Sequence, residues 1–360
     1  MLELSIVIPS FNERDNVKEL IARLGRVLTG ISWEVIYVDD DSPDGTADVV
    51  REIARGNSSI RCLQRIGRRG LSRAVVEGVL ASSAPFIAVM DADLQHDESI
   101  LPQMLAKAKD GGLDFVVGSR YCGGGSVGEW DSKRAAMSRF ATSLSRMIVT
   151  TELTDPMSGF FLMRREAFNA AVKRLSGEGY KILLDLFASS PTPPKFAEVP
   201  FTFRERVAGE SKLDSAVLWE YLMLILDKMF GHIVPVRFIL FSLVGGSGLL
   251  VHFFFLWLTY RVGEMEFSTG QAIATAIAMT SNYVLNNFLT YRDRRRRGTK
   301  FFTGLLSFYL VCGIGAIGNV GVANFIFQRQ NGWWLAGIAG VIVGTVWNYV
   351  ATALFTWGRR

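Results

Sequence analysis

Four long apolar segments occupy the last third of the chain and set the first limit on its fold. They cover residues 238–260, 268–290, 301–327 and 333–357, are 23 to 27 residues long and are nearly free of charge. A helix needs about 20 apolar residues to cross the hydrocarbon core of a bilayer. The sequence therefore predicts an all-α membrane domain of four transmembrane helices over residues 234–360.

The basic residues near these segments lie mainly on one side. The loop from Arg292 to Lys300 holds six of them, whereas the two opposite loops hold one each, Arg261 and Arg329. By the positive-inside rule, the Arg-rich loop and both chain ends are expected in the cytoplasm. An anionic membrane surface explains the net charge of +5, and in the absence of a nucleic-acid motif no nucleic-acid partner is expected.

The membrane half contains an internal repeat. The pattern Phe-x-Leu-Val-x-Gly-x-Gly at residues 241–248 recurs at 308–315, and Asn-Tyr-Val at 282–284 recurs at 348–350. Two helical hairpins of the same orientation are predicted, with glycines that allow close helix approach. Several asparagines either line a path for a lipid headgroup or form hydrogen bonds between helices: Asn282, Asn286, Asn319 and Asn348.

In the first half, short apolar runs alternate with helical patterns. The runs Leu4–Ile8, Glu34–Val38, Phe86–Met90 and Phe115–Tyr121 predict strands, most of them joined by helices. This alternation is typical of a doubly wound, Rossmann-like α/β domain with a mostly parallel sheet. Ligands of such sheets bind at the carboxyl ends of the strands.

The third of these runs ends in the sequence VMDADLQH, which carries the strongest functional signal. Asp91, Asp93 and Gln95 occupy alternate positions and are expected to converge. Their oxygen atoms suit a hard cation such as Mg²⁺ or Mn²⁺ that also holds a diphosphate. The alternative is a solvated acidic loop after a strand.

The second run ends in three consecutive carboxylates, which repel one another and must be held apart. We interpret Asp40 as an acceptor for a base or ribose, and Ser42 and Asp44 as caps of a helix that starts near Thr46. The basic segment Arg65–Arg73 that follows is either a solvated loop or part of a phosphate site.

Three later segments suggest contact with a membrane or with phosphate. Residues 133–150 predict an amphipathic helix with a basic face in the membrane interface, or else an ordinary surface helix. Residues 201–212 predict a loop that closes over phosphate oxygens through Arg204, Arg206 and Lys212, or else a charged linker. Residues 214–233 predict an interface helix with an apolar stripe at helical spacing: Trp219, Leu222, Met223, Leu226, Met229 and Phe230.

Six motifs in order carry a resemblance to a known family: VIPSFNE, VDDDSPDGT, MDADLQH, GSRY, DPMSGFF and FRERVAGESK. Over residues 4–213 the chain resembles family 2 glycosyltransferases of GT-A fold, and more narrowly dolichyl-phosphate mannose synthases and bacterial polyprenyl-phosphate glycosyltransferases. The repeated hairpins resemble the GtrA-like membrane family. The expected organisation is a catalytic domain at 1–213, an interface helix at 214–233 and a membrane domain at 234–360.

The resemblance implies roles for individual residues. Asp93 and Gln95 would hold the metal, and the catalytic set would be Asp91, Asp93, Arg120, Arg206 and Lys212. The sugar nucleotide would contact Pro9, Phe11, Glu13, Val38, Asp40, Asp91, Ala92, Asp93, Lys181, Arg206 and Lys212. Phe11 stands where relatives often have tyrosine, so stacking on a base is retained but a hydroxyl contact is not.

The expected reaction is the metal-dependent, inverting transfer of mannose from GDP-mannose to dolichyl or another polyprenyl phosphate at the cytoplasmic membrane face. Two alternatives stay open at this point. The donor could be UDP-glucose, since base and hexose are selected by a few loop contacts. The protein could also be a lipid-linked sugar flippase whose first half only binds a nucleotide sugar. The sequence leaves the oligomeric state open.

Overall fold

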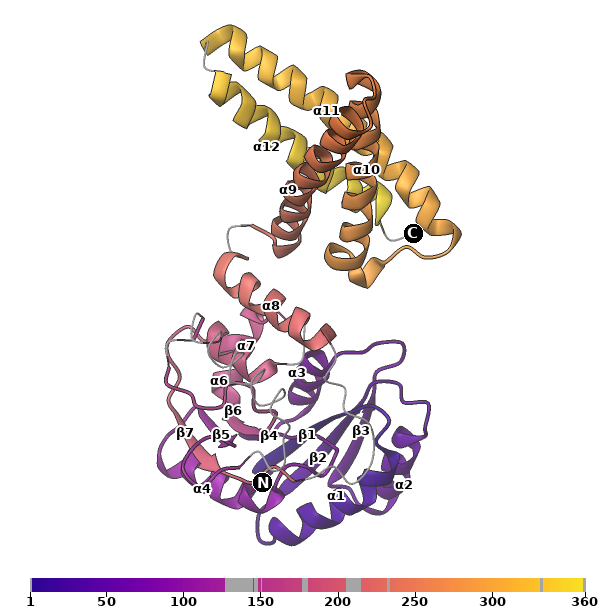
Figure 1. Ribbon diagram of the computed structural model, residues 1–360. Helices are drawn as coiled ribbons and strands as arrows, with labels where there is room; N and C mark the ends of the chain where they lie inside the picture. Colours follow the sequence, from indigo (N-terminus) through magenta and orange to yellow (C-terminus); the bar gives the residue numbers. More distant parts are fainter. Residues whose placement is uncertain are drawn as a thin grey trace. The chain divides into compact units, whose positions relative to one another are not determined.

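The computed structural model describes residues 2–126, 145, 148–149, 151–176, 181–204, 215–231, 234–330 and 333–358. The chain divides into two compact units, residues 1–229 and 230–360 (Figure 1). Most of the amphipathic helix predicted at 133–150 lies outside the described residues, as do Arg206 and Lys212.

The first unit is built on one seven-stranded sheet with the order β3-β2-β1-β4-β6-β5-β7. The chain leaves β1 in one direction through β2 and β3 and returns to its other side as β4, so β1 and β4 flank a topological switch point. Only β6 runs against its neighbours, which confirms the mostly parallel sheet. The strands are β1 (Leu4–Ser10), β2 (Trp33–Asp39), β3 (Ile60–Gln64), β4 (Phe86–Val89), β5 (Phe115–Ser119), β6 (Phe161–Arg164) and β7 (Phe196–Pro200).

Helices cover both faces of this sheet (Figure 1). Alternate strand residues point to opposite faces, so Ile6 joins one apolar core and Val7 the other. The first core includes side chains of α1 (Arg14–Val27), α2 (Thr46–Gly56) and α4 (Leu101–Asp110). The second includes side chains of α3 (Leu71–Ala81), α6 (Arg165–Ala171) and α7 (Ile182–Ser189).

Helix α8 (Ser215–Phe230) ends the first unit and packs on the second core. It buries Tyr221, Leu224 and Ile225, and its Lys228 Nζ lies 2.6 Å from Oδ1 of the fully buried Asp185. Of the stripe predicted from the sequence, Leu222 stays 38% exposed. The helix packs on the domain through these buried residues and through Met229, one member of the stripe, and docking of the stripe on a bilayer stays a prediction.

The second unit is helical. Among the described residues, three stretches are long and apolar enough to cross a membrane: Val236–Val262, Thr299–Arg329 and Gly337–Thr356. A helix also forms in the fourth predicted span, but its serine, threonine, glutamine and asparagine side chains lower its hydropathy, and the count of four is not confirmed. The helices are α9 (Val236–Trp257), α10 (Phe267–Leu285), α11 (Thr299–Gln330) and α12 (Trp333–Ala351), and π-helical turns follow α9, α10 and α12 at Leu258–Val262 (η3), Asn286–Thr290 (η4) and Thr352–Thr356 (η6).

The predicted repeat is visible in the packing of this unit. Helix α9 pairs with α10, and α11 pairs with α12. In each hairpin a glycine faces an asparagine of the paired helix, where an added Cβ would collide: Gly248 with Asn282, and Gly315 with Asn348. The asparagines thus pack against facing backbone, while Asn286 donates to the Asn282 carbonyl oxygen of its own helix at 2.9 Å.

The two hairpins exchange equivalent aromatic contacts, as two copies related by a pseudo-two-fold axis would. Phe241 of the first copy lies 5.7 Å from Tyr349 of the second, and Phe308 of the second lies 5.7 Å from Tyr283 of the first. Tyr291 and Trp357, which end the two copies, stack with ring centroids 4.1 Å apart. These rings form the buried centre of the second unit.

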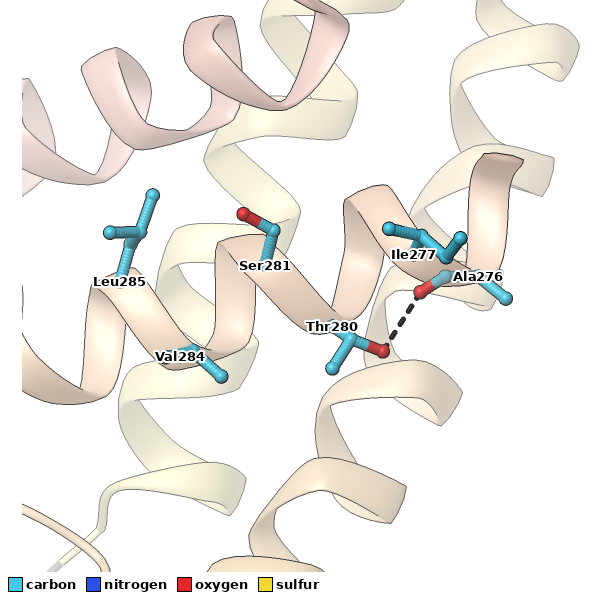
Figure 2. Close-up of a pocket in the computed structure, with 6 residues that line it drawn as sticks. All are labelled: Ala276, Ile277, Thr280, Ser281, Val284 and Leu285. Atoms are coloured by element: carbon cyan, nitrogen blue, oxygen red, sulfur yellow. Dashed lines mark hydrogen bonds between the residues drawn. The ribbon is translucent and has the colours of Figure 1, made fainter. Parts of the chain in front are cut away.

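A hollow of about 420 Å³ lies along α10 (Figure 2). Its lining is mostly small and apolar: Ala276, Ile277, Thr280, Ser281, Val284 and Leu285. The Thr280 hydroxyl donates to the Ala276 carbonyl oxygen at 2.8 Å, so this polar group is satisfied within the helix. The repeat asparagines do not line this hollow.

Candidate active site

The sheet topology brings the sequence motifs to one edge. Strands β1, β2, β4, β5 and β7 run in one direction, so their carboxyl ends meet there, and β6 begins at the same edge because it runs in the opposite direction. Five predicted motifs follow or precede these strand ends. The sixth begins at Phe203, three residues after the end of β7, and continues beyond Arg204.

The segment after β4 folds into a tight turn. Leu94 has a φ of +63°, an uncommon conformation for a residue with a branched side chain, and it is buried. The Gln95 backbone N–H donates to Asp93 Oδ1 at 3.2 Å. The Asp91 N–H donates to His96 Nδ1 at 3.1 Å, and the Asp91 side chain is 37% exposed. The turn thus sets a buried Asp93 beside Gln95 and a more accessible Asp91 beside His96.

Arg120 follows β5 and forms a two-pronged ion pair with Asp155. Its Nε lies 2.7 Å from Asp155 Oδ2 and its Nη2 lies 2.8 Å from Oδ1. Asp155 is fully buried. Burial alone would lower the pKa of the Arg120 guanidinium, but the hydrogen bonds and charge of Asp155 raise it, with a smaller contribution from Asp91. Arg120 therefore stays cationic within the electrostatic reach of Asp91.

The loop before β6 packs closely on the Asp91 turn. A Cβ added at Gly159 would lie 3.1 Å from Asp91 Oδ2 and 3.5 Å from His96 Cε1. The neighbouring Phe160 ring stacks on His96 with centroids 5.1 Å apart. This loop therefore supports three predicted or neighbouring site residues, Asp91, His96 and Arg120.

A Gly159→Ala variant is expected to lower kcat by about threefold to tenfold, since the added methyl displaces the Asp91 carboxylate by a few tenths of an ångström and small displacements of reacting groups are costly. The free energy of unfolding should change by less than about 1 kcal/mol, because the neighbour that must move is partly exposed. Steady-state kinetics and thermal unfolding measure the two effects. Gly123→Ala, where a Cβ meets nothing within 4 Å, is the control. Equal activities would contradict the role of Gly159.

The three carboxylates after β2 are separated by different hydrogen-bond donors. Asp39 accepts from Ser42 Oγ at 2.5 Å, and Asp41 accepts from Gln64 Nε2 at 3.1 Å. Asp40 accepts from Arg65 Nη1 at 2.5 Å and from the Gly70 N–H at 2.7 Å. The predicted contact of Asp40 with a nucleotide would therefore involve a carboxylate that also anchors the Arg65–Gly70 segment.

Two expectations for this region need correction. The N-cap residue of α2 is Gly45; Asp44, one residue earlier, accepts from the Thr46 N–H at 2.9 Å. Ser42 makes no contact of this kind, because its hydroxyl joins Asp39 to the Asn12 N–H. Arg65 is only 1% exposed and pairs with Asp40 and Glu77, so it is neither solvated nor open to phosphate. Its burial follows from the long-range pairing with Asp40, which no local pattern reveals.

The end of β1 presents the remaining predicted nucleotide contacts. Pro9 lies opposite Val38 in the β1–β2 register. The Arg69 guanidinium carbon lies 4.1 Å from the centroid of the Phe11 ring. Glu13 precedes α1 and accepts from Asn16 Nδ2 at 2.8 Å.

The segment that follows β7 packs against the turn that holds Asp93. The Arg204 N–H donates to the Gln95 carbonyl oxygen at 2.9 Å, and Gln95 Nε2 donates to the Arg204 carbonyl oxygen at 3.0 Å. The Arg204 guanidinium pairs with Asp97 and Glu98 at 2.7 Å each. It therefore anchors the segment, contrary to the expectation that it closes over phosphate.

Lys181 lies at the cap position before α7, where its carbonyl oxygen accepts from the Asp185 N–H at 3.2 Å. Ala92, between the two aspartates of the turn, is buried. The predicted contacts of both residues with a sugar nucleotide stay predictions.

The donor set at the turn fits a divalent cation that also binds substrate phosphate. Asp91, Asp93 and Gln95 supply carboxylate and amide oxygens, and Mg²⁺ is usually held by one or two carboxylates together with substrate phosphates. Two carboxylates and one amide oxygen therefore suit a cation that also binds a diphosphate. Among the described residues, no group of three or more His, Cys, Asp or Glu side chains could hold a metal ion.

Comparison with known proteins agrees with this architecture. Residues 5–171 match the glycosyl transferase family 2 model, and residues 240–357 match the GtrA/DPMS transmembrane domain model. A dolichol-phosphate mannosyltransferase of Pyrococcus furiosus is 34% identical over 99% of both chains. The Mycosarcoma maydis enzyme of the same name is 37% identical over 67% of this chain and 84% of its own length.

Among solved structures, one that is similar is a glucosyl-3-phosphoglycerate synthase from Mycobacterium tuberculosis in complex with Mn²⁺, UDP-glucose and phosphoglyceric acid. Its TM-score is 0.47, its sequence identity is 19%, and the match covers 63% of this chain and 79% of that chain. The family assignment depends on the sequence relatives, of which the Pyrococcus furiosus protein matches the chain almost end to end. The chain belongs to the dolichol-phosphate mannosyltransferases, and in it a glycosyl transferase family 2 domain of GT-A fold is joined to a GtrA/DPMS transmembrane domain.

Proposed function

We propose that this enzyme transfers mannose from GDP-mannose to the phosphate of dolichol or another polyprenol at the cytoplasmic face of a membrane. The observation that carries the proposal is the Asp91–His96 turn, which lies at one sheet edge with the Arg120–Asp155 pair in a chain that also has membrane-spanning helices. The names of the relatives supply the acceptor and the sugar. The distribution of basic residues supports the cytoplasmic face.

The cation would be Mg²⁺ or Mn²⁺, held by Asp93 and Gln95 together with the donor diphosphate. When bound, it would neutralise the charge that develops on the leaving group. The chain's own contribution is to fix the oxygen atoms: Asp93 Oδ1 is oriented by the Gln95 N–H, and the Gln95 side chain is oriented by the Arg204 carbonyl oxygen. Asp91, more accessible, would face the sugar.

The nucleoside would lie across the ends of β1 and β2. Phe11 would stack on the base, and Pro9, Glu13, Val38 and Asp40 would line its site. The Arg69 guanidinium contacts the Phe11 ring at 4.1 Å, too close for a base to fit between them. Stacking of the base on that ring face therefore requires Arg69 to move, and the two φ-positive glycines of its segment, Gly67 and Gly70, are suited to such a change.

The acceptor phosphate would be screened by cations. An alkyl phosphate is largely ionised near neutral pH, since its second pKa is about 6, so it needs no general base. Arg120 is held in a fixed orientation by Asp155, while Arg206, Lys212 and Lys181 would supply further positive charge. In-line attack would invert the anomeric centre.

Purified protein assayed with GDP-mannose, GDP-glucose, UDP-glucose and a short polyprenyl phosphate tests the proposal. Transfer from GDP-mannose should dominate, should fall by at least about 10²-fold after metal removal with EDTA, and should recover on addition of Mg²⁺ or Mn²⁺. Preference for UDP-glucose would instead identify a glucosyltransferase. Absence of transfer from every donor, with binding retained, would favour a flippase with a binding module.

A further inference from the structure

The Arg-rich loop of the second unit is fixed on the end of α10. Asn287 is fully buried, and its Oδ1 accepts from the Arg296 N–H at 2.8 Å while its Nδ2 donates to the Arg296 carbonyl oxygen at 3.1 Å. Trp357 Nε1 donates to the same Oδ1 at 3.2 Å. A buried side chain thus fixes the loop backbone, which makes the loop a preorganised surface.

This loop forms one wall of a hollow of about 330 Å³ between η4 and the start of α11. Three arginines and three phenylalanines line it: Arg295, Arg296, Arg297, Phe288, Phe301 and Phe302. The Arg295 guanidinium carbon lies 3.6 Å from the centroid of the Phe288 ring, and Phe302 is 71% exposed. Cations and exposed aromatic rings therefore meet in one hollow.

The positive charge of the hollow is not balanced within the described part of the chain. The nearby Asp293 carboxylate is paired with Arg237 at 2.9 Å and lies 3.6 Å from Arg294. In the described residues, no carboxylate forms an ion pair with Arg295, Arg296 or Arg297. Three guanidinium groups therefore remain available for an anion from outside the chain.

The hollow lies where a membrane-crossing stretch, Thr299–Arg329, begins. A ligand in this hollow would contact arginine side chains at the level of the lipid headgroups and phenylalanine rings at the level of the lipid chains. Guanidinium groups bind phosphate oxygens in a two-pronged manner, and basic pockets between transmembrane helices bind anionic headgroups. We propose that this hollow binds the phosphate headgroup of an anionic lipid, with Arg295 and Arg297 on the phosphate and Phe302 on the chain.

Binding of dioctanoyl phosphatidic acid to the full-length protein in neutral detergent tests this site. The double variant Arg295→Gln/Arg297→Gln is expected to bind it about 30-fold more weakly than the unmodified protein, given the contribution of each cation near an anionic headgroup. Arg295→Lys, which keeps the charge but not the planar fork, should give a smaller loss. Thermal unfolding of each variant checks that the fold is retained.

Arg329→Gln is the matched control, because Arg329 is also exposed and lies 4.3 Å from the Phe325 ring, but at the opposite end of α11. It should bind phosphatidic acid like the unmodified protein. Equal affinities for the double variant and the unmodified protein, or an equal loss in Arg329→Gln, would overturn the site.

Competition identifies the source of the phosphate. A short polyprenyl phosphate that displaces phosphatidic acid would assign the site to the acceptor class, and failure to displace it would assign the site to membrane phospholipid. Displacement by inorganic phosphate at equal concentration would overturn the need for a lipid chain. The binding measurement does not involve sugar transfer, so its outcome is independent of the proposed reaction.

Discussion

An Asp93→Ala variant is expected to lose sugar transfer while its fold stays intact, with a fall in kcat of at least about 10²–10³-fold. Asp93 is a buried carboxylate whose Oδ1 is fixed by the Gln95 N–H. Removing it would take away the oxygen that we propose to hold the cation on the donor diphosphate. The leaving-group charge would then develop without compensation.

Two measurements separate this role from simple destabilisation. Transfer is assayed at saturating donor, and GDP affinity is measured with and without Mn²⁺. The unmodified protein should bind GDP more tightly with Mn²⁺, whereas the variant should show little difference. Asp110→Ala, at the exposed end of α4 in the same βα unit, is the control and should behave like the unmodified protein. Near-normal turnover of Asp93→Ala would refute the metal assignment.

An Asp155→Ala variant is expected to lower the free energy of unfolding of the first unit by about 3–5 kcal/mol, because it leaves the Arg120 guanidinium buried without its partner. Both hydrogen bonds between Arg120 and Asp155 are short, at 2.7 and 2.8 Å, and Asp155 is fully buried. For a unit of this size the unfolding midpoint should fall by about 10 °C. Activity should also fall, since Arg120 loses its fixed orientation.

Exposed Glu152, three residues earlier in the same loop, provides the control: Glu152→Ala should change the midpoint by less than about 2 °C. The double variant Arg120→Ala/Asp155→Ala should recover part of the lost stability, because no charge is then left unpaired. An Asp155→Ala protein as stable as Glu152→Ala would show that the pair contributes nothing to the fold.

Much of the fold could be predicted from local patterns. Each predicted apolar run of the first half forms a strand. The run that precedes Asp91 and Asp93 is followed by an ordered turn at the edge of the sheet where ligands are expected to bind. The repeat in the membrane half predicted two like hairpins with close helix approach at glycines, and the structure shows this approach where Gly248 faces Asn282 and Gly315 faces Asn348. These features follow from periodicities of two or about 3.6 residues and from small residues at close helix contacts, all of which a sequence displays directly.

The partners of the polar groups could not be predicted in this way. Arg65 looked like a member of a basic loop, and no local pattern assigned a partner to Asp155. Arg204 looked like a phosphate ligand, yet each of these side chains is paired across the fold. No local pattern assigned a partner to His96, whose buried ring stacks on Phe160 and accepts from the Asp91 N–H.

The sequence alone determined the class of each half: alternation of strands and helices requires a layered α/β domain, and apolar segments of membrane length require a bilayer. Only the tertiary structure decided which charges are structural and which remain available for ligands. The reason is physical. Burial of apolar residues is encoded in short-range periodicity, whereas a buried charge is stabilised by a partner that only folding brings near, as Asp155 is brought to Arg120.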